Sequence, residues 1–449
     1  MRIFLFFAIL CAFTAIGAVP ENAALDFQGV IQAAKEKVFP AVVYIRAVRE
    51  NPESGDESAN VISGSGVVID PSGEILTNHH VIDRVIDVRC LLEDGRSWPA
   101  EIIGGDKELD IALIRLLRDS DDTVPLPTAV LDKVTGQTEG DFVMAMGAPW
   151  GMNRSVSIGI ISCASRYLND KSQYSLWYQT DAVIFPGNSG GPLVNISGNV
   201  IGINTLGGES GIGFAVPAAT IMDVLPGLRE FGAVNWSWYG INFQPLRDFN
   251  RNIYFPYEEG VIVASTEPNS PAREAGIFPN DRIVAVNGNP VTAVTEEQLP
   301  DFRRMLALLP LGEPVVFSVA RGEEMLQVEI VPKERGAVGQ SDITVCKRWG
   351  LSAAAINRFD TPNLFFYQQT GVYIAAVSKI GNAVDAGLVP GDIIVSVNGV
   401  AIDSIEDLLA EYDKAVKLVF IRPRADIVIL RNGQELRKIM DFSKVYDQE

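Results

Sequence analysis

The second half of the chain contains one pattern twice, and this repeat constrains the fold more than any other feature. The segment SPAREAGIFPNDRIVAVNG begins at Ser270, and the related segment GNAVDAGLVPGDIIVSVNG begins 111 residues later, at Gly381. Each copy predicts a short helix closed by a glycine, a turn that carries proline and aspartate, and a strand that ends in an Asn-Gly turn. A period of this length is too long for one unit of a solenoid. The second half is therefore predicted to hold two copies of a small domain.

The first half follows a different pattern. Between about residues 40 and 220, short strand-like runs such as AVVYIRAV, GSGVVID, DIALIRLL, DFVMAMG and VIGINT are separated by Gly, Pro, Asn and Asp. This spacing favours an all-β barrel or sandwich over alternating strands and helices. Residues 26–38 and 218–232 predict amphipathic helices that flank the strands and close the domain.

The N-terminus and the composition exclude several classes of protein. Arg2 precedes an apolar run that ends in small residues, which predicts a secretory signal peptide over residues 1–18, cleaved after Gly17 or Ala18. The alternative is an uncleaved anchor, although the run is short for a membrane-spanning helix. The formal net charge of −19 argues against a nucleic-acid partner. Few and scattered cysteines and histidines allow at most one disulfide, and we expect neither a metal nor a cofactor.

The stretch GNSGGPL, which begins at Gly187, surrounds one serine with three glycines. A serine nucleophile needs a base, a group that orients the base, and donors for an oxyanion. His79 and His80 are the only histidines of the chain, so one of them must be the base if Ser189 is the nucleophile. We expect Gly187, Asn188 and Ser189 to form the oxyanion hole, at on the order of 3 kcal/mol per donor. The alternative is an ordinary turn with a solvent-exposed histidine pair.

Two carboxylates compete to orient the base. Asp110 precedes the apolar run IALIRLL, where an unpaired charge is costly. Asp106 is flanked by Lys107 and Glu108, which predict a solvated turn. We therefore predict Asp110 as the third member. The resulting order of histidine, aspartate and serine matches the chymotrypsin-like proteases, not the subtilisins or the α/β-hydrolases.

Together, these motifs resemble the HtrA/Deg serine proteases. LTNHHV, DIALIRL, TDAVIFPGNSGGPLVN and GIGFAVPA occur in the order of that family, and the two repeats resemble PDZ domains. The resemblance covers nearly all of the chain after the leader and implies a mainly β fold, with a chymotrypsin-like double β-barrel followed by two PDZ-like α+β domains. The expected domains are the signal peptide over 1–18, the trypsin-like protease domain over 24–230, and PDZ domains over 236–335 and 343–445.

The family pattern assigns roles to single residues of the protease domain. It implies that His80 is the base, Asp110 the orienting acid and Ser189 the nucleophile. His79 departs from the pattern, because asparagine is usual at its position, and we expect its side chain to point away from the site. Asn188 stands where chymotrypsin-like zymogens carry an aspartate, so activation by cleavage of the N-terminus is not expected.

Other segments resemble the regulatory parts of the family. Residues 165–176 match its sensor loop, and Arg166 would link that loop to the active site; the alternative is a solvated surface arginine. In PDZ domains an aromatic-Gly-aliphatic loop offers N–H groups to a peptide carboxylate, while the peptide adds as a strand. The residues that would do so here are Tyr239, Gly240 and Ile241 in the first copy and Trp349, Gly350 and Leu351 in the second.

The specificity and the function follow from these predictions. Val183, Ile203 and Asn204 are expected to line a substrate pocket without an acidic floor, which favours cleavage after small or medium aliphatic residues. The leading hypothesis is a periplasmic, ATP-independent serine endopeptidase of protein quality control and stress response. It would act on unfolded proteins and hydrophobic C-termini as a homotrimer or higher oligomer, with peripheral membrane contact allowed. Two alternatives stay open: a chaperone or adaptor with an inactive protease fold, and a membrane-anchored regulatory protease with one dedicated substrate.

Overall fold

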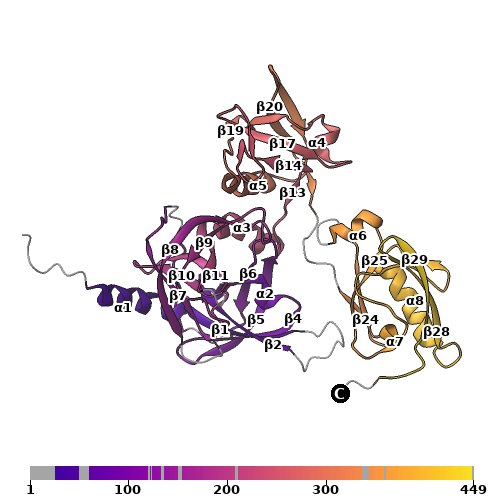
Figure 1. Ribbon diagram of the computed structural model, residues 1–449. Helices are drawn as coiled ribbons and strands as arrows, with labels where there is room; N and C mark the ends of the chain where they lie inside the picture. The colour runs from indigo at the N-terminus through magenta and orange to yellow at the C-terminus, as the bar shows by residue number, and fades with distance from the viewer. Residues whose placement is uncertain are drawn as a thin grey trace, which may run out of the picture.

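The computed structural model describes residues 26–49, 60–119, 122, 124–132, 136–149, 154–207, 211–335, 343–357 and 361–446. The predicted signal peptide over residues 1–18 lies outside this part of the chain. The described residues form three units, which Figure 1 shows as a pair of barrels, a smaller unit above them and a third unit beside them. No helix among the described residues is long and apolar enough to cross a membrane.

Two closed antiparallel barrels of six strands each form the first unit. The first barrel, in the order β1-β2-β3-β6-β5-β4, consists of β1 (Val42–Arg49), β2 (Asn60–Val68), β3 (Glu74–Thr77), β4 (Val85–Leu91), β5 (Ser97–Asp106) and β6 (Ile111–Leu116). The second, in the order β10-β11-β12-β9-β8-β7, consists of β7 (Phe142–Gly147), β8 (Ser155–Tyr167), β9 (Leu176–Thr180), β10 (Pro192–Asn195), β11 (Val200–Leu206) and β12 (Gly213–Pro217). The predicted double barrel is confirmed.

Short helices complete the first unit. They are α1 (Phe27–Val38), η1 (Phe39–Ala41), α2 (His79–Ile82) and α3 (Ala218–Phe231). The helix α1 begins after Asp26, whose side chain accepts a hydrogen bond from the N–H of Gly29. The helix α3 ends at Gly232, which adopts a left-handed φ of 74°. Arg229 of α3 pairs with the buried Glu74 of β3 at 2.7 Å, which holds this helix on the first barrel.

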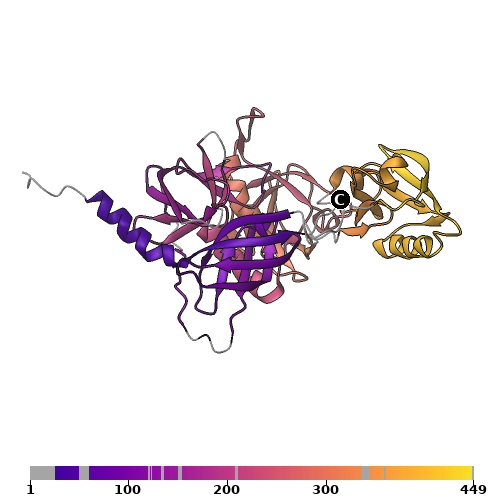
Figure 2. The ribbon, with the colours of Figure 1, turned by 90° about the horizontal axis from the view of Figure 1, so that it is seen from below.

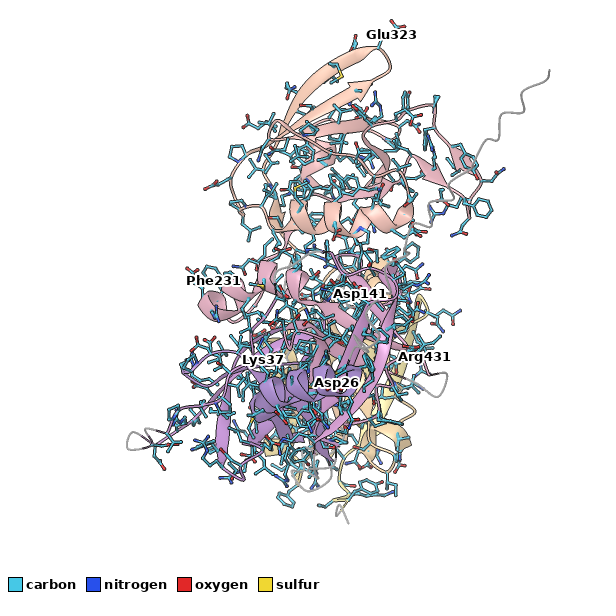
Figure 3. All side chains as sticks on the ribbon, turned by 90° about the vertical axis from the view of Figure 1, so that its left-hand side faces the viewer. Asp26, Lys37, Asp141, Phe231, Glu323 and Arg431 are labelled. Carbon is cyan, nitrogen blue, oxygen red and sulfur yellow. The ribbon has the colours of Figure 1, made fainter. Side chains whose placement is uncertain are left out.

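The second unit is a twisted antiparallel sheet with helices packed on it. Asp281 is buried and pairs with Arg321 at 2.7 Å, which joins the turn before β18 to β20. Figure 3 shows Glu323, at the tip of the hairpin between β20 and β21, far from the barrels. The strands and helices of this unit are β13 (Ser237–Trp238), β14 (Ile241–Gln244), β15 (Arg247–Asp248), β16 (Ile253–Tyr254), β17 (Val261–Thr266), α4 (Pro271–Glu274), β18 (Arg282–Val286), β19 (Asn289–Pro290), η3 (Glu296–Gln298), α5 (Leu299–Ala307), β20 (Val315–Arg321), β21 (Glu324–Ile330) and β22 (Lys333–Glu334).

The third unit repeats this design, as the sequence predicts. Asp392 is fully buried and pairs with Arg431 at 2.6 Å, as Asp281 pairs with Arg321 in the second unit. Its elements are β23 (Thr344–Cys346), β24 (Leu351–Ala355), α6 (Pro362–Tyr367), β25 (Val372–Val377), α7 (Asn382–Asp385), β26 (Ile393–Val397), β27 (Val400–Ala401), α8 (Ile405–Lys417), β28 (Arg424–Arg431) and β29 (Gln434–Asp441). In Figure 2 this unit stands at the opposite end of the molecule from α1.

The first and second units contact each other through side chains. Arg304 of α5 pairs with Asp223 of α3 at 3.1 Å and donates to the carbonyl oxygen of Tyr174, in the loop between β8 and β9. The indole N–H of Trp236, in the connection between the units, donates to Asp106 at 2.7 Å. These contacts place the second unit over the end of the barrels that carries the turn between β5 and β6.

Candidate active site

The two histidines lie at the start of α2, directly after β3. Asn78 precedes them and is buried; its side chain donates to the carbonyl oxygen of Asp110 and to the hydroxyl of Thr205, at 2.9 Å each. Asp110 follows the turn after β5, and Thr205 lies on β11 of the other barrel. One amide therefore ties the histidine helix to both barrels, at the cleft between them.

Asp110 holds His80 through two hydrogen bonds. Its Oδ2 atom lies 2.8 Å from Nδ1 of the imidazole, and its Oδ1 atom accepts the backbone N–H of His80 at 2.9 Å. The residue adopts a left-handed φ of 54°, which is uncommon outside glycine. The bond from Asn78 to its carbonyl oxygen supports this conformation. The structure therefore brings together the histidine and the aspartate that the sequence predicts.

The rival carboxylate, Asp106, does not contact either histidine through a hydrogen bond among the described residues. It is 7% exposed, so the prediction of a solvated turn is wrong at this position. Trp236, 130 residues further along the chain, covers it and donates to it, as does the N–H of Leu109. Burial raises the pKa of Asp106 to about 6, against these two hydrogen bonds.

The glycines around Ser189 are required by close backbone contacts. Gly190 has φ of 85°, and a Cβ atom there would lie 2.2 Å from the carbonyl oxygen of Ser65. Ser65 also donates through its N–H to the carbonyl oxygen of Ser189 and through its hydroxyl to that of Gly187. Asn204, buried beneath the turn, accepts the N–H of Gly190 and donates to two further carbonyl oxygens. The turn is thus held from both barrels.

The backbone N–H groups of this turn differ in their availability. The N–H of Asn188 donates to the carbonyl oxygen of Phe185 at 2.9 Å, so Asn188 cannot serve the oxyanion hole as expected. Across the described residues, no hydrogen bond leaves the N–H of Gly187 or Ser189. The hydroxyl of Ser189 donates to the carbonyl oxygen of Thr205 at 3.3 Å, not to His80. Hydrogen bonds between catalytic side chains are often long or poorly aligned in a site without substrate.

A cleft of about 690 Å³ contains Ser189, His80 and Asp110. The residues that line it on the apolar side are Trp177, Ile184, Phe185, Pro186 and Leu206. The three pocket residues predicted from the sequence do not line it, which corrects that prediction. Ile203 and Asn204 belong to β11 and are fully buried, outside the lining of the cleft. Ile184 lines the cleft where Val183 was expected. The register of β11 shifts between Asn204 and Leu206, which changes the side that faces the cleft.

His79 also lines the cleft, with its ring against Gly105 of β5. Burial lowers its pKa below the ordinary histidine value, while Asp83 and Asp110 oppose that shift. The imidazole is therefore neutral at neutral pH. His79 therefore lies within the site rather than away from it, contrary to our expectation.

The described cysteines, Cys90, Cys163 and Cys346, are free thiols.

The loop between β8 and β9 contacts the active site by residues other than the one predicted. Arg166 is exposed and donates to Gln179 of β9 at 2.8 Å, so it does not link the loop to the site. Instead, the N–H of Gln173 donates to Glu108, in the turn that carries Asp110. A residue on the outer face of a strand points away from the cleft, and the sequence gives no sign of which face Arg166 occupies.

The predicted carboxylate loops have different surroundings in the two repeats. Tyr239, Gly240 and Ile241 line a cavity of about 140 Å³ between β14 and α5. In the third unit, Gly350 lines a cavity of about 440 Å³ together with Ser378 and Tyr412, while Trp349 and Leu351 are fully buried in the core. Each loop therefore borders a cavity through its glycine.

Known families match the same regions. A trypsin-like peptidase domain model matches residues 64–203, and a PDZ domain model matches residues 262–321 and 373–422. A probable periplasmic serine endoprotease DegP-like from Halomonas elongata is 34% identical over 356 residues, covering 77% of this chain and 72% of the relative. A protein of the same name from Hahella chejuensis is 30% identical over 451 residues, covering 91% of each.

Solved structures agree with the family matches. The HtrA-type protease AlgW with tripeptide has a TM-score of 0.58 at 29% identity, covering 69% of this chain and 98% of that one. A serine endoprotease from Yersinia pestis has a TM-score of 0.51 at 30% identity, covering 68% and 97%. The double barrel, its cleft and the two repeats define a chymotrypsin-like serine endopeptidase with PDZ domains. Within that class, the chain belongs to the HtrA family, the family of the DegP-like serine endoproteases.

Proposed function

We propose that this protein is a periplasmic serine endopeptidase that degrades unfolded proteins, with Ser189 as its nucleophile. The observation that carries the proposal is the double hydrogen bond of Asp110 to His80, in the same cleft as Ser189. The periplasmic location is supported by the names of the relatives and by the predicted signal peptide. No cofactor takes part in this chemistry.

Each member of the site has a defined role in this proposal. The Oγ atom of Ser189 attacks the substrate carbonyl carbon while Nε2 of His80 takes its proton. Asp110 keeps the other imidazole proton on Nδ1 and stabilises the imidazolium. The oxyanion lies against the N–H groups of Gly187 and Ser189, and His80 then returns the proton to the leaving amine. In the second half of the reaction, His80 takes a proton from water, which attacks the acyl carbonyl carbon. The bond from that carbon to Oγ of Ser189 then breaks, and His80 returns the proton to Oγ.

The cleft and the repeats indicate the substrates. Ile184, Phe185 and Leu206 provide apolar surface on one side of the cleft, which suits aliphatic side chains. The PDZ units would bind extended segments or hydrophobic C-termini and raise the local concentration of substrate. Assembly into a trimer through the barrels is part of the proposal. The exposed rings of Phe27, the first residue of α1, and Phe142, the first residue of β7, pack together and offer apolar surface for it.

One experiment separates this function from the alternative, a chaperone that binds unfolded proteins without cutting them, which the serine endoproteases among the relatives do not favour. Digestion of casein by the wild type and by Ser189→Ala separates the two functions. Cleavage after aliphatic residues by the wild type alone supports the protease. If neither chain cuts and both suppress aggregation of the substrate, the chaperone function replaces it.

A further inference from the structure

The sheets of the two PDZ units end differently. In the second unit, β14 is the last strand of the sheet and pairs with β17 alone among the described strands, so its other edge faces the cavity beside α5. In the third unit, the equivalent strand β24 pairs with β25 on one edge and with β23 on the other. The strand β23 also contacts α8, the counterpart of α5. It therefore lies in the slot between strand and helix where a PDZ domain takes a peptide.

The direction of β23 is also that of a bound peptide. It runs antiparallel to β24, with Thr344 opposite Ala353 and Cys346 opposite Leu351. The strand reaches the loop of residues 347–350 at its C-terminal end, and a peptide bound by a PDZ domain places its carboxylate at that loop.

The loop donates to β23 as it would to a carboxylate. The N–H groups of Trp349 and Gly350 both donate to the carbonyl oxygen of Cys346, at 3.0 Å each. In the second unit, no described residue accepts a hydrogen bond from the corresponding N–H groups of Tyr239 and Gly240. Within the described residues, the N–H groups of the loop are therefore satisfied internally in the third unit but not in the second.

The side chain of Cys346 fills the place of a terminal apolar side chain. It is fully buried, in one apolar cluster with Leu351 of β24 and Leu408 of α8. A further contact closes the slot at this end, since the hydroxyl of Tyr412 on α8 accepts the N–H of Arg348 at 2.9 Å. A peptide could enter only after Cys346 had left this cluster.

We propose that the strand Thr344–Cys346 is a built-in ligand of the second PDZ domain, so that only the first PDZ domain is open to peptide C-termini. This inference rests on the peptide-binding role in the proposed function and assigns that role to one of the two repeats. The ligand class is an extended segment with a free carboxylate and an apolar last residue, since Ile241, Phe243 and Leu306 line the open groove.

The test measures how many peptides bind the full chain. The probe is a decapeptide ending in valine with a free carboxylate, its amidated form is the control, and Ser189→Ala prevents cleavage. Calorimetry is expected to give one peptide per chain, and none after Ile241→Glu in the open groove. Cys346→Asp places a carboxylate in an apolar cluster, which should expel β23 and raise the number to two. Cys346→Ser, which carries no charge, should still give one.

The reactivity of the Cys346 thiol reports whether β23 occupies the slot, and this measurement needs no substitution in the third unit. Burial raises its pKa to about 12, as it does for Cys90 in the barrel core, and both thiols should react slowly with iodoacetamide. Mass mapping after labelling reports each thiol separately, with the partly exposed Cys163 as the reactive reference. When the peptide saturates the first site, Cys346 should stay as protected as Cys90. Binding of a second peptide should occur only together with labelling of Cys346.

Two results would overturn the proposal. One is two peptides per unmodified chain with Cys346 still protected; the other is a folded Cys346→Asp chain that gains no site. If Cys346→Asp unfolds the third unit, the labelling of the unmodified chain still decides. If no peptide binds the Ser189→Ala chain at all, peptide capture fails as part of the proposed function. The gain of a site in Cys346→Asp would even then report whether β23 blocks the slot.

Discussion

Replacing Asp110 by Asn should remove activity and leave the fold intact. The two carboxylate oxygens of Asp110 accept from Nδ1 and from the backbone N–H of His80. Asparagine has one oxygen and one NH2 group, so it can accept only one of these two hydrogens. If its oxygen keeps the backbone N–H, its NH2 group faces Nδ1. The imidazole must then carry its proton on Nε2, where it cannot accept the proton of Ser189.

The expected loss is large because the wrong tautomer disables the base. A tautomer change of this kind lowers kcat by about 10⁴, or roughly 5.5 kcal/mol in the activation free energy. The fold loses one hydrogen bond, which costs about 1 kcal/mol. The assay is the initial rate of casein digestion at pH 8, with thermal unfolding measured on each variant.

Asp106→Asn is the matched control for this experiment. Asp106 lies four residues before Asp110 and binds Trp236 and Leu109 instead of His80. It should keep its rate within tenfold of the wild type. A rate above a tenth of wild type in Asp110→Asn would refute the reasoning. Equal inactivation of both variants, with both folded, would also refute it, because the hydrogen bonds to His80 would then not be what matters.

Three further outcomes are expected. Gly190→Ala should abolish proteolysis and lower the melting temperature, because its Cβ would lie 2.2 Å from the carbonyl oxygen of Ser65; Gly190→Ala with wild-type activity would contradict this. Arg431→Ala should destabilise the third unit by about 3–5 kcal/mol in urea unfolding, since it leaves Asp392 buried without its partner, and a change below about 1 kcal/mol would count against it. Burial raises the pKa of Asp106 from 3.8 to about 6. Between these two pH values, the folded chain therefore keeps a proton on Asp106 that the unfolded chain has lost. That stabilisation is complete below pH 4 and disappears as the pH rises through 6; melting temperatures from pH 4 to 7.5 should fall less steeply in Asp106→Asn, and identical slopes would exclude this residue as the cause.

The sequence predicted those parts of the site that depend on local chemistry. The glycines at Ser189, the two adjacent histidines and the carboxylate before a buried strand each carry their own signal in a few residues. The repeat likewise predicted two copies of one domain, since its turn and strand recur with the same spacing. Where a short segment determines its own structure, sequence reasoning was sufficient.

The errors arose where distant segments meet. Asp106 looked solvated because its cover, Trp236, follows 130 residues later. The pocket prediction failed at a register shift in β11, which depends on how that strand pairs with β12. Arg166 could not be assigned to a face without knowledge of its neighbour, Gln179. Pairing across a sheet is a property of two segments at once, and a single stretch of sequence does not contain it.

The same reasoning explains why the two repeats differ at the peptide slot. The segment Val234–Trp236 stands before the loop of the first repeat, where Thr344–Cys346 stands before the loop of the second. In the first repeat, Trp236 is held away from β14: its indole binds Asp106, and its ring stacks on Tyr174 with centroids 4.6 Å apart. The corresponding Cys346 packs instead in the core of its own unit and pairs with Leu351 of β24 as part of β23. The barrels thus hold Trp236 away from β14, and Gln173 and Tyr174 of the protease unit themselves line the first slot. We therefore expect peptide binding in the first PDZ unit to depend on its contact with the protease unit.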